Sequence, residues 1–373
     1  MKHTNFPRIL EEVIAQYPFQ GELIHCTPFG SGHINDTYLL TYRLADRTKQ
    51  KIVIQRINTT AFKKPVELME NMLGVTEHLR RKILEQNGDP NRETLTALRA
   101  KDGNAYVWDS QGGFWRATLY VTNTVSYDSV EKPELFYESA VAFGRFQSLL
   151  SDYPAHTLHE TIPDFHNTSV RFETFKKAVE EDAMGRADSV REEIQFLLDR
   201  EEIAHCFGKL LEKGEIPLRV THNDTKLNNV MFDIHTGKGI CVVDLDTVMP
   251  GLAMNDFGDS IRFGASTAAE DERDLSKVWC DMDLFRLYAK GFLAGCDNKL
   301  TPREVELLPM GAKVMTYECG MRFLTDYLQG DVYFKIHREH QNLDRFRTHR
   351  KLITDMEAKW DQMQSIIQKL TEE

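Results

Sequence analysis

The chain has 373 residues, of which 41% are hydrophobic and 28% are charged, as in an ordinary soluble globular protein. Its formal net charge of −11 disfavours binding to nucleic acid or to anionic membranes, and no apolar run is long enough to span a membrane. The six cysteines are scattered without metal-ligand spacing, so they indicate neither a disulfide framework nor a zinc site. We therefore expect a cytoplasmic monomer.

Residues 1–122 have the pattern of a β-rich N-terminal lobe. A short amphipathic helix is predicted over residues 6–17, strands follow from Leu23, and a helix over residues 63–86 interrupts them. Later strands are predicted over residues 94–100, 104–109 and 113–122. Together these segments predict an antiparallel sheet of five or six strands.

A glycine-containing turn lies between the first two predicted strands. Gly30 and Gly32 allow the backbone to approach a phosphate group closely and to donate N–H groups to it, although such turns also occur in ordinary hairpins. We predict a nucleotide-phosphate site at Gly30, Ser31, Gly32 and Asn35.

Residues 123–127 are predicted to be a hinge, and residues 128–373 a mainly helical C-terminal lobe. Helices are expected over residues 131–152, 171–183, 189–213, 271–295, 302–328 and 346–371. His156, His159 and His166 fall in a predicted loop without an obvious further ligand, so we expect solvated or hydrogen-bonded histidines and no metal site there.

Residues 222 to 244 have the spacing of a phosphoryl-transfer site. His222, Asp224 and Asn229 spell H-x-D-x-x-x-x-N, and two short strands joined by a glycine turn lead to Asp244. Such a hairpin holds Asp224, Asn229 and Asp244 at one rim. Phosphoryl transfer requires a carboxylate that orients the attacking hydroxyl, and an amide oxygen and a second carboxylate that hold Mg²⁺. The spacing therefore predicts a kinase that uses ATP and Mg²⁺, with Asn229 and Asp244 as the metal ligands.

Two other motifs in this region favour different readings. Asp256-Phe257-Gly258 spells the D-F-G of kinases but lies 32 residues after Asp224, too far for the metal position, so we predict a turn or helix cap that supports the loop. Asp244-Leu245-Asp246-Thr247 matches the D-x-D-x-T of haloacid-dehalogenase-type phosphatases. Their later acidic motif would be Gly258-Asp259-Ser260, only a dozen residues on, whereas that fold needs several βα units in between. The spacing excludes the phosphatase.

These features, in this order, resemble the aminoglycoside phosphotransferase/choline kinase superfamily. The resemblance implies an α+β, protein-kinase-like fold with an antiparallel β N-lobe and a mainly helical C-lobe. More narrowly, the amino-acid sequences of several segments resemble those of the bacterial N-acetylhexosamine 1-kinases. The segments that carry this resemblance are GHIN (32–35), TVSY (124–127), RVTHNDTKLNN (219–229), VVDLDTVMPG (242–251), DFGDSIRFGAST (256–267) and ECGMRFLTDYLQGDVYF (318–334).

The resemblance implies phosphorylation of the anomeric hydroxyl of GlcNAc or GalNAc, with ATP and Mg²⁺, to give the sugar 1-phosphate and ADP. Asp224 is then the catalytic base, and the substrate pocket is lined by His33, Phe263, Arg322 and Tyr333. Without the resemblance, a helical arginine is usually part of a surface ion pair and a phenylalanine usually belongs to the core.

The third predicted strand, Lys51–Ile57, departs from the kinase pattern. Kinases carry a phosphate-binding lysine there, but this chain has Gln55 with Arg56 beside it. Neighbouring strand residues face opposite sides of a sheet, so only one of the two side chains points into a nucleotide cleft. Either Gln55 binds the phosphates without charge, or Arg56 supplies the cation, or the site is weakened; a glutamine here is also typical of the N-acetylhexosamine 1-kinases.

Two rival functions remain open. Another small-molecule kinase of the superfamily would act on choline, homoserine or an aminoglycoside. A non-catalytic nucleotide-binding module is suggested only by Gln55, and the presence of Asp224, Asn229 and Asp244 argues against it.

Overall fold

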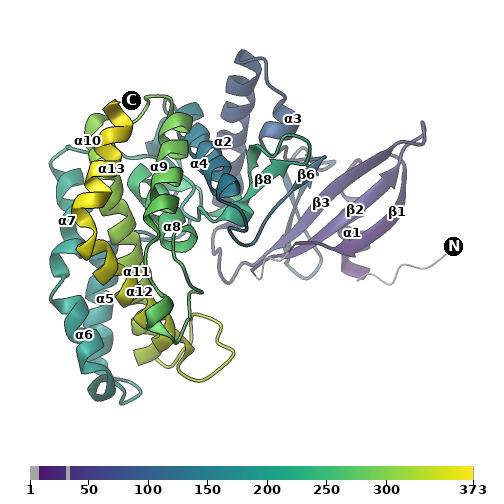
Figure 1. Ribbon diagram of the computed structural model, residues 1–373. Helices are drawn as coiled ribbons and strands as arrows, with labels where there is room; N and C mark the ends of the chain where they lie inside the picture. Colours follow the sequence, from purple (N-terminus) through teal and green to yellow (C-terminus); the bar gives the residue numbers. More distant parts are fainter. Residues whose placement is uncertain (1–7, 31–33, 373) are drawn as a thin grey trace.

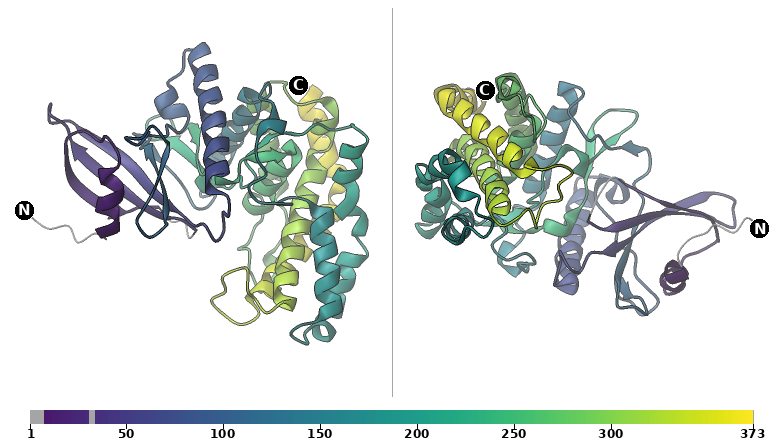
Figure 2. Two further views of the ribbon diagram at one scale, coloured as in Figure 1. Left: turned by 180° about the vertical axis from the view of Figure 1, so that it is seen from behind. Right: turned by 90° about the horizontal axis from the view of Figure 1, so that it is seen from below.

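The computed structural model describes residues 8–30 and 34–372 and has two lobes (Figure 1). An antiparallel sheet and a short helix form the N-lobe, and the C-lobe is mainly helical. Figure 2 shows the same division from two further sides, with the sheet at one end of the molecule and the long helices at the other. The predicted α+β fold class is confirmed.

The N-lobe sheet has five strands in the order β1-β2-β3-β5-β4, and all neighbours are antiparallel. The strands are β1 (Glu22–Pro28), β2 (Asp36–Arg43), β3 (Lys49–Ile57), β4 (Tyr106–Trp108) and β5 (Phe114–Leu119). The strand predicted over residues 94–100 is wrong, since only an isolated bridge joins Ala97 to Thr118. β4 already occupies the first half of that edge of β5, which leaves little room for a further ladder.

The two faces of this sheet have different neighbours. The outer face packs its apolar residues, among them Ile54 and Trp115, against α1 (Arg8–Ala15). The inner face carries Gln55 and Arg116, and it is turned toward α2 (Pro65–Glu85) and the C-lobe.

Several predicted helices of the C-lobe differ from the observed ones at their ends. These helices are α4 (Pro133–Leu149), α5 (Thr168–Glu181), α6 (Arg191–Leu198), α7 (Glu201–Glu212), α8 (Ala253–Gly264), α9 (Met282–Cys296), α10 (Pro302–Glu306), α11 (Leu308–Leu328), α12 (Gln341–Ala358) and α13 (Trp360–Glu372); the short α3 (Pro90–Glu93) precedes β4. The predicted helix 271–295 begins only at Met282, because the Asp281 side chain caps it by accepting the N–H groups of Asp283 and Leu284. No helix in the described part of the chain is long and apolar enough to cross a membrane.

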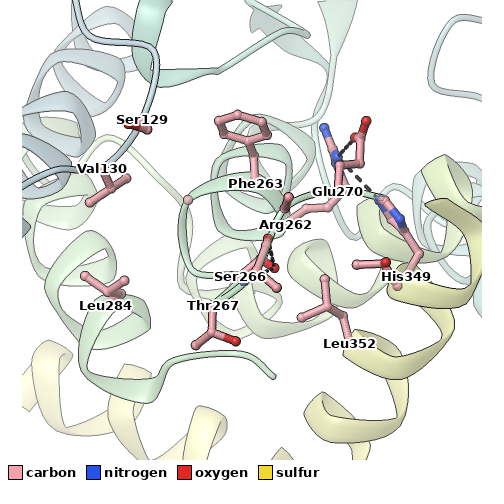
Figure 3. A pocket seen from close by; sticks show the side chains of 14 residues that line it. Ser129, Val130, Arg262, Phe263, Ser266, Thr267, Glu270, Leu284, His349 and Leu352 are labelled. Atoms are coloured by element: carbon pink, nitrogen blue, oxygen red, sulfur yellow. Dashed lines mark hydrogen bonds and ion pairs between the residues drawn. The ribbon is translucent and has the colours of Figure 1, made fainter. Parts of the chain in front are cut away.

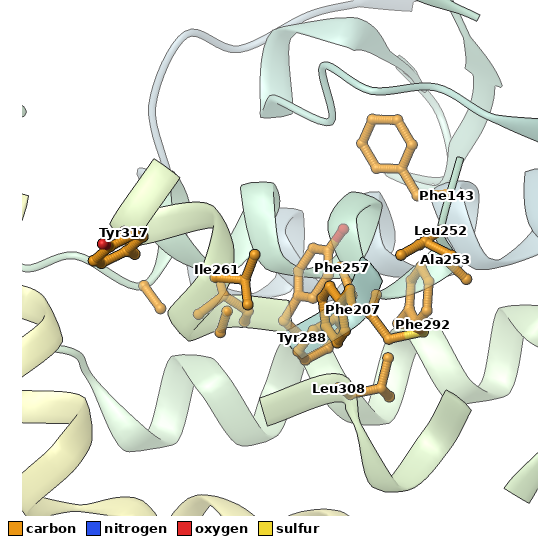
Figure 4. Packing of buried hydrophobic residues seen from close by; sticks show 14 of the residues in the cluster. Phe143, Phe207, Leu252, Ala253, Phe257, Ile261, Tyr288, Phe292, Leu308 and Tyr317 are labelled. Atoms are coloured by element: carbon orange, nitrogen blue, oxygen red, sulfur yellow. The ribbon is translucent and has the colours of Figure 1, made fainter. Parts of the chain in front are cut away.

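Helix α8 lies at the centre of the C-lobe and was not predicted as a helix. In Figure 4 its Phe257 packs beside Tyr288 and Phe292 of α9, with ring centroids 5.6 and 5.4 Å apart. Polar residues of α8 are buried as well, including Asn255, Asp256, Asp259, Ser260 and Arg262. Burial on every side removes the apolar stripe by which a surface helix is detected in a sequence.

The glycine of the D-F-G motif is required by the contact between α8 and α11. A Cβ atom at Gly258 would lie 2.2 Å from the carbonyl oxygen of Gly311. We expect Gly258→Ala to lower the free energy of unfolding by about 3 kcal/mol, because two helix backbones must move apart. Urea denaturation measures this, with Gly208→Ala in α7 as the control, where the new Cβ lies 3.6 Å from its nearest neighbour. Equal stability of both variants would contradict the account.

Candidate active site

The H-x-D loop is held in place by a buried carboxylate of α8. The loop follows β7 (Arg219–Thr221), which pairs with β10 (Met249–Gly251). Asp256 accepts hydrogen bonds from the backbone N–H groups of His222 at 2.9 Å and Asn223 at 2.8 Å, and from Nε2 of Gln147 at 2.9 Å. Burial raises the pKa of Asp256 even though these hydrogen bonds favour its charged form. The D-F-G segment thus supports the loop, as predicted, but it lies inside α8, so the predicted turn or helix cap is wrong.

His222 connects this loop to the strand that precedes Asp244. Its Nε2 donates to the carbonyl oxygen of Val243 at 2.8 Å, and its Nδ1 accepts the N–H of Asp224 at 3.3 Å. The ring packs edge-on against Phe143, with centroids 5.5 Å apart. His222 is therefore a structural residue that fixes the backbone next to Asp224.

The structure brings the three predicted phosphoryl-transfer residues together. β8 (Val230–Asp233) and β9 (Gly239–Val242) form the predicted hairpin, and Val243 N–H donates to the carbonyl oxygen of Asn229 at 2.9 Å. Nδ2 of Asn229 donates to the Asp224 carbonyl oxygen at 2.8 Å and to its Oδ2 at 3.2 Å. Asp224, Asn229 and Asp244 thus lie at one rim of this hairpin.

The residues around Asp244 fit a divalent cation. Asp244 has a left-handed backbone (φ 58°) that turns the chain sharply after β9. Asp244 is exposed, but protein atoms surround its carboxylate closely. This loss of hydration, together with the charges of Asp246 and Asp224, raises its pKa to about 6. A group of carboxylates with an adjacent amide oxygen has the donor types that Mg²⁺ prefers, and a cation there relieves their repulsion.

Lys226 is a site residue that the sequence analysis missed. Its Nζ lies 2.7 Å from Oδ1 of Asp224. Burial acts to lower its pKa, but Asp224 and Asp259 outweigh this effect and raise it, so the amine stays protonated at neutral pH. The sequence feature that could have identified Lys226 is its position two residues after Asp224 in the same loop.

The two candidate phosphate ligands of the third strand, Gln55 and Arg56, lie on opposite faces of the sheet. Gln55 lies on the inner face of the sheet, whereas Arg56 lies on the outer face with its Nε 4.0 Å from the carboxylate of Asp109. The structure therefore does not bring Arg56 to the face turned toward the C-lobe. Arg116, which was not predicted, is on that inner face opposite Gln55.

The predicted glycine turn is described only in part. Gly30 has a left-handed backbone (φ 85°) and open space where a Cβ atom would lie. Asn35 donates from Nδ2 to Asp246 at 2.7 Å, which places it beside the Asp244 loop. The predicted nucleotide ligands Ser31 and Gly32 and the predicted substrate ligand His33 lie outside the described residues.

Two of the predicted substrate residues meet on the C-lobe. Nη2 of Arg322, on α11, donates to the Tyr333 hydroxyl at 3.3 Å, and its guanidinium lies 5.5 Å from the centre of the Tyr333 ring. The buried carboxylate of Asp326 accepts the N–H groups of Val332, Tyr333 and Phe334 at 2.8 to 3.0 Å. This places the exposed Tyr333 over Arg322.

A second arginine, Arg171 on α5, lies behind this pair. Its Nη2 donates to the carbonyl oxygen of Phe165, whose ring is 5.7 Å from the Arg322 guanidinium. Burial and the positive charge of Arg322 lower the pKa of Arg171. Among the described residues, the buried Nε of Arg171 has no hydrogen-bond partner, and no carboxylate lies within 4.0 Å of either guanidinium.

His166 joins Glu318 of α11 to the H-x-D loop. Its Nδ1 donates to Glu318 at 2.7 Å and its Nε2 donates to the carbonyl oxygen of Asn223 at 3.0 Å. Burial opposes the charged form, but the carboxylate of Glu318 outweighs it and raises the pKa of His166. The prediction that His166 is a hydrogen-bonded histidine is confirmed.

Phe263, the third described substrate candidate, lies elsewhere. It is 36% exposed and lines a cavity of about 330 Å³ together with Ser129 and Val130. Neither Arg322 nor Tyr333 lines this cavity. Figure 3 shows Phe263 beside the cavity, while the neighbouring Arg262 points toward Glu270 and His349. The structure therefore brings Arg322 and Tyr333 together, and it does not bring Phe263 to them.

His349 makes the stability of this region dependent on pH. Burial and the adjacent Arg262 lower its pKa to about 4, so the folded state keeps the ring neutral while the unfolded chain protonates near pH 6.5. Stability is therefore lost as the pH falls below 6.5. We expect urea unfolding to show a loss of about 2 kcal/mol from this residue between pH 7 and pH 5. In the His349→Gln variant this loss of unfolding free energy between pH 7 and pH 5 disappears. If the free energy of unfolding of the variant still falls with pH as in the wild type, His349 is not its source.

Comparison with known proteins agrees with this geometry. Residues 25–280 match the phosphotransferase enzyme family, APH. An aminoglycoside phosphotransferase from Alicyclobacillus acidocaldarius aligns over 100% of this chain and 99% of its own, with a TM-score of 0.57 at 10% identity. Amicoumacin kinase in complex with AMP-PNP, Ca²⁺ and Ami aligns over 93% of each chain, with a TM-score of 0.55 at 15% identity.

An ethanolamine kinase from Plasmodium vivax aligns over 87% of this chain and 82% of its own, with a TM-score of 0.50 at 13% identity. At these identities the structural likeness establishes the fold, which is the kinase-like arrangement of two lobes. The family match covers more than half of the chain, including the H-x-D loop and the strand before Asp244. The chain therefore belongs to the phosphotransferase enzyme family.

Proposed function

We propose that the protein is an ATP- and Mg²⁺-dependent kinase that phosphorylates the anomeric hydroxyl of N-acetylhexosamines. The products are the sugar 1-phosphate and ADP. The motif sequences resemble those of N-acetylhexosamine 1-kinases, which suggests this acceptor. The arrangement of Asp224, Asn229 and Asp244 supports phosphoryl transfer.

The observation that carries the acceptor class is the arginine pair, Arg171 and Arg322. Acceptors such as choline, ethanolamine or an aminoglycoside are cations at neutral pH, and among the described residues no carboxylate lies within 4.0 Å of either guanidinium to attract them. The nearby carboxylate of Glu318 is already bound by His166 and Thr168. A neutral sugar with hydroxyl and acetamido oxygens instead offers acceptors for these donors. The Tyr333 ring supplies an apolar surface for a sugar face.

The chemistry assigns a task to each residue of the loop. Asp224 accepts the proton of the sugar hydroxyl, and the anomeric hydroxyl suits it because that group is more acidic than an ordinary alcohol. Lys226 holds Asp224 at 2.7 Å and places a positive charge beside the transferred group. Asn229 and Asp244 would hold Mg²⁺, which when bound neutralises charge that develops on the phosphates.

The direct test is ADP release with Mg·ATP over a panel of GlcNAc, GalNAc, galactose, choline and kanamycin. We expect kcat/KM for an N-acetylhexosamine to exceed that for choline and kanamycin by at least about a hundredfold. A preference for choline or kanamycin would show that the proposed acceptor is wrong and that the protein is nevertheless a phosphotransferase. Absence of turnover on every acceptor, with ATP still bound, would favour the nucleotide-binding module.

Arg322→Met tests the acceptor pocket separately. Loss of its hydrogen bonds to the sugar raises the KM of the N-acetylhexosamine by about 30-fold and leaves the KM of ATP within about twofold. The matched control is Arg191→Met, an exposed arginine that pairs only with the exposed Asp188. Steady-state kinetics with each substrate varied in turn give both constants. A rise in the KM of ATP instead would place Arg322 outside the acceptor site.

A further inference from the structure

Arg116 is a buried guanidinium on the inner face of the N-lobe sheet. It lies on β5 opposite Gln55 of β3, and residues paired in this way present their side chains on the same face. Arg116 is 2% exposed, and its Nε donates to Oε1 of Gln55 at 3.0 Å. Nε2 of Gln55 donates to the hydroxyl of Thr37 at 3.1 Å, which turns the amide oxygen toward Arg116.

The counter-ion of Arg116 comes from the other lobe. Its Nη1 donates to Oδ1 of Asp246, two residues after the candidate metal ligand Asp244. Asn35 donates to the other oxygen of the same carboxylate at 2.7 Å. Asp246 is 3% exposed, so two donors of the N-lobe hold the loop that carries Asp244.

Stability alone does not account for such a buried pair. Removing two charges from water costs free energy that their attraction recovers only in part, and apolar residues of similar volume are often at least as stable. Phosphoryl transfer, in contrast, requires positive charge beside the nucleotide phosphates. At the strand position where kinases place a lysine, this chain has the uncharged Gln55, and Arg116 provides a cation one strand away on the same face.

We propose that Arg116 is the cation that positions the nucleotide phosphates, in a role that other kinases give to the residue at position 55. Gln55 orients its guanidinium, and Asp246 ties it to the loop of Asp244. A planar guanidinium serves both partners at once, whereas an ammonium group is a single point charge. The inference rests on the nucleotide use of the proposed function and is independent of the sugar acceptor.

The test is nucleotide binding by the full chain with Mg²⁺ and without acceptor, measured by calorimetry with AMP-PNP and with adenosine. For Arg116→Met we expect the Kd of AMP-PNP to rise about 30-fold while the Kd of adenosine stays within about twofold. Arg116→Lys keeps the charge and raises the Kd of AMP-PNP only about fivefold. The control is Arg43→Met, an exposed arginine at the end of β2, which leaves both constants unchanged.

A double variant separates charge from structure. In Gln55→Lys/Arg116→Met, the lysine lies on the same face of the sheet and supplies a new counter-ion for Asp246. We expect the affinity for AMP-PNP to return to within about fivefold of the wild-type value. Equal weakening of AMP-PNP and adenosine, or a folded double variant without recovery, would overturn the proposal. If Arg116→Met does not fold, the double variant and Arg116→Lys decide the matter, and neither readout depends on which acceptor the enzyme uses.

Discussion

Asp224→Asn should lower kcat by about a thousandfold and leave the affinity for AMP-PNP within about threefold. The amide keeps the shape of the side chain but does not accept the proton of the acceptor hydroxyl, and general bases contribute on the order of 10² to 10⁴ to a rate. The nucleotide contacts are expected to persist, because Asn35, Gln55, Arg116 and Asp246 do not touch Asp224. Single-turnover kinetics and calorimetry measure the two quantities.

The control for this variant is Asp188→Asn, a carboxylate that is 85% exposed and forms an ion pair with the exposed Arg191. It should behave as the wild type in both measurements. Near-normal turnover of Asp224→Asn would remove Asp224 from the role of base. A loss of nucleotide affinity equal to the loss in kcat would instead mean that the whole loop had moved.

Asp256→Ala should affect both stability and catalysis. Truncation leaves the buried N–H groups of His222 and Asn223 and the amide of Gln147 without their acceptor. We expect the free energy of unfolding to fall by about 4 kcal/mol and kcat to fall by about a hundredfold, because these N–H groups set the backbone next to Asp224. Urea denaturation and ADP release measure the two effects.

Asp256→Asn is the informative companion to this variant. It restores one acceptor oxygen and places an NH₂ group against a backbone donor, so both losses should be intermediate. An alanine variant with wild-type kcat would show that the loop keeps its shape without Asp256. A variant equally stable but inactive would place Asp256 in direct contact with the reacting groups.

The parts of the site that the sequence predicted are those encoded by local spacing. Asp224, Asn229 and Asp244 lie within one loop and one hairpin, so their separation along the chain fixes their meeting in space. Arg322 and Tyr333 were each inferred from a resemblance, and they meet in the structure because Asp326 binds the backbone that carries Tyr333.

The parts that the sequence did not predict depend on contacts between distant segments. Arg116 contacts Gln55 of the neighbouring strand, 61 residues away in the sequence, and Asp246, 130 residues away. No local pattern marks either contact. Helix α8 was missed because buried Asp256 and Asp259 interrupt its apolar pattern. The strand expected over residues 94–100 had the right composition, but β4 occupies the first half of the edge of β5 that it needed.

The central claim is transfer of phosphate to an anomeric hydroxyl. The most direct measurement is ³¹P NMR of the product formed from N-acetylhexosamine, Mg²⁺ and ATP, with observation of coupling between phosphorus and the anomeric proton. The account predicts a sugar phosphate signal that couples to this proton. A product whose phosphorus couples to the protons at carbon 6, or a phosphorylated amine-bearing acceptor from the same panel, would contradict it.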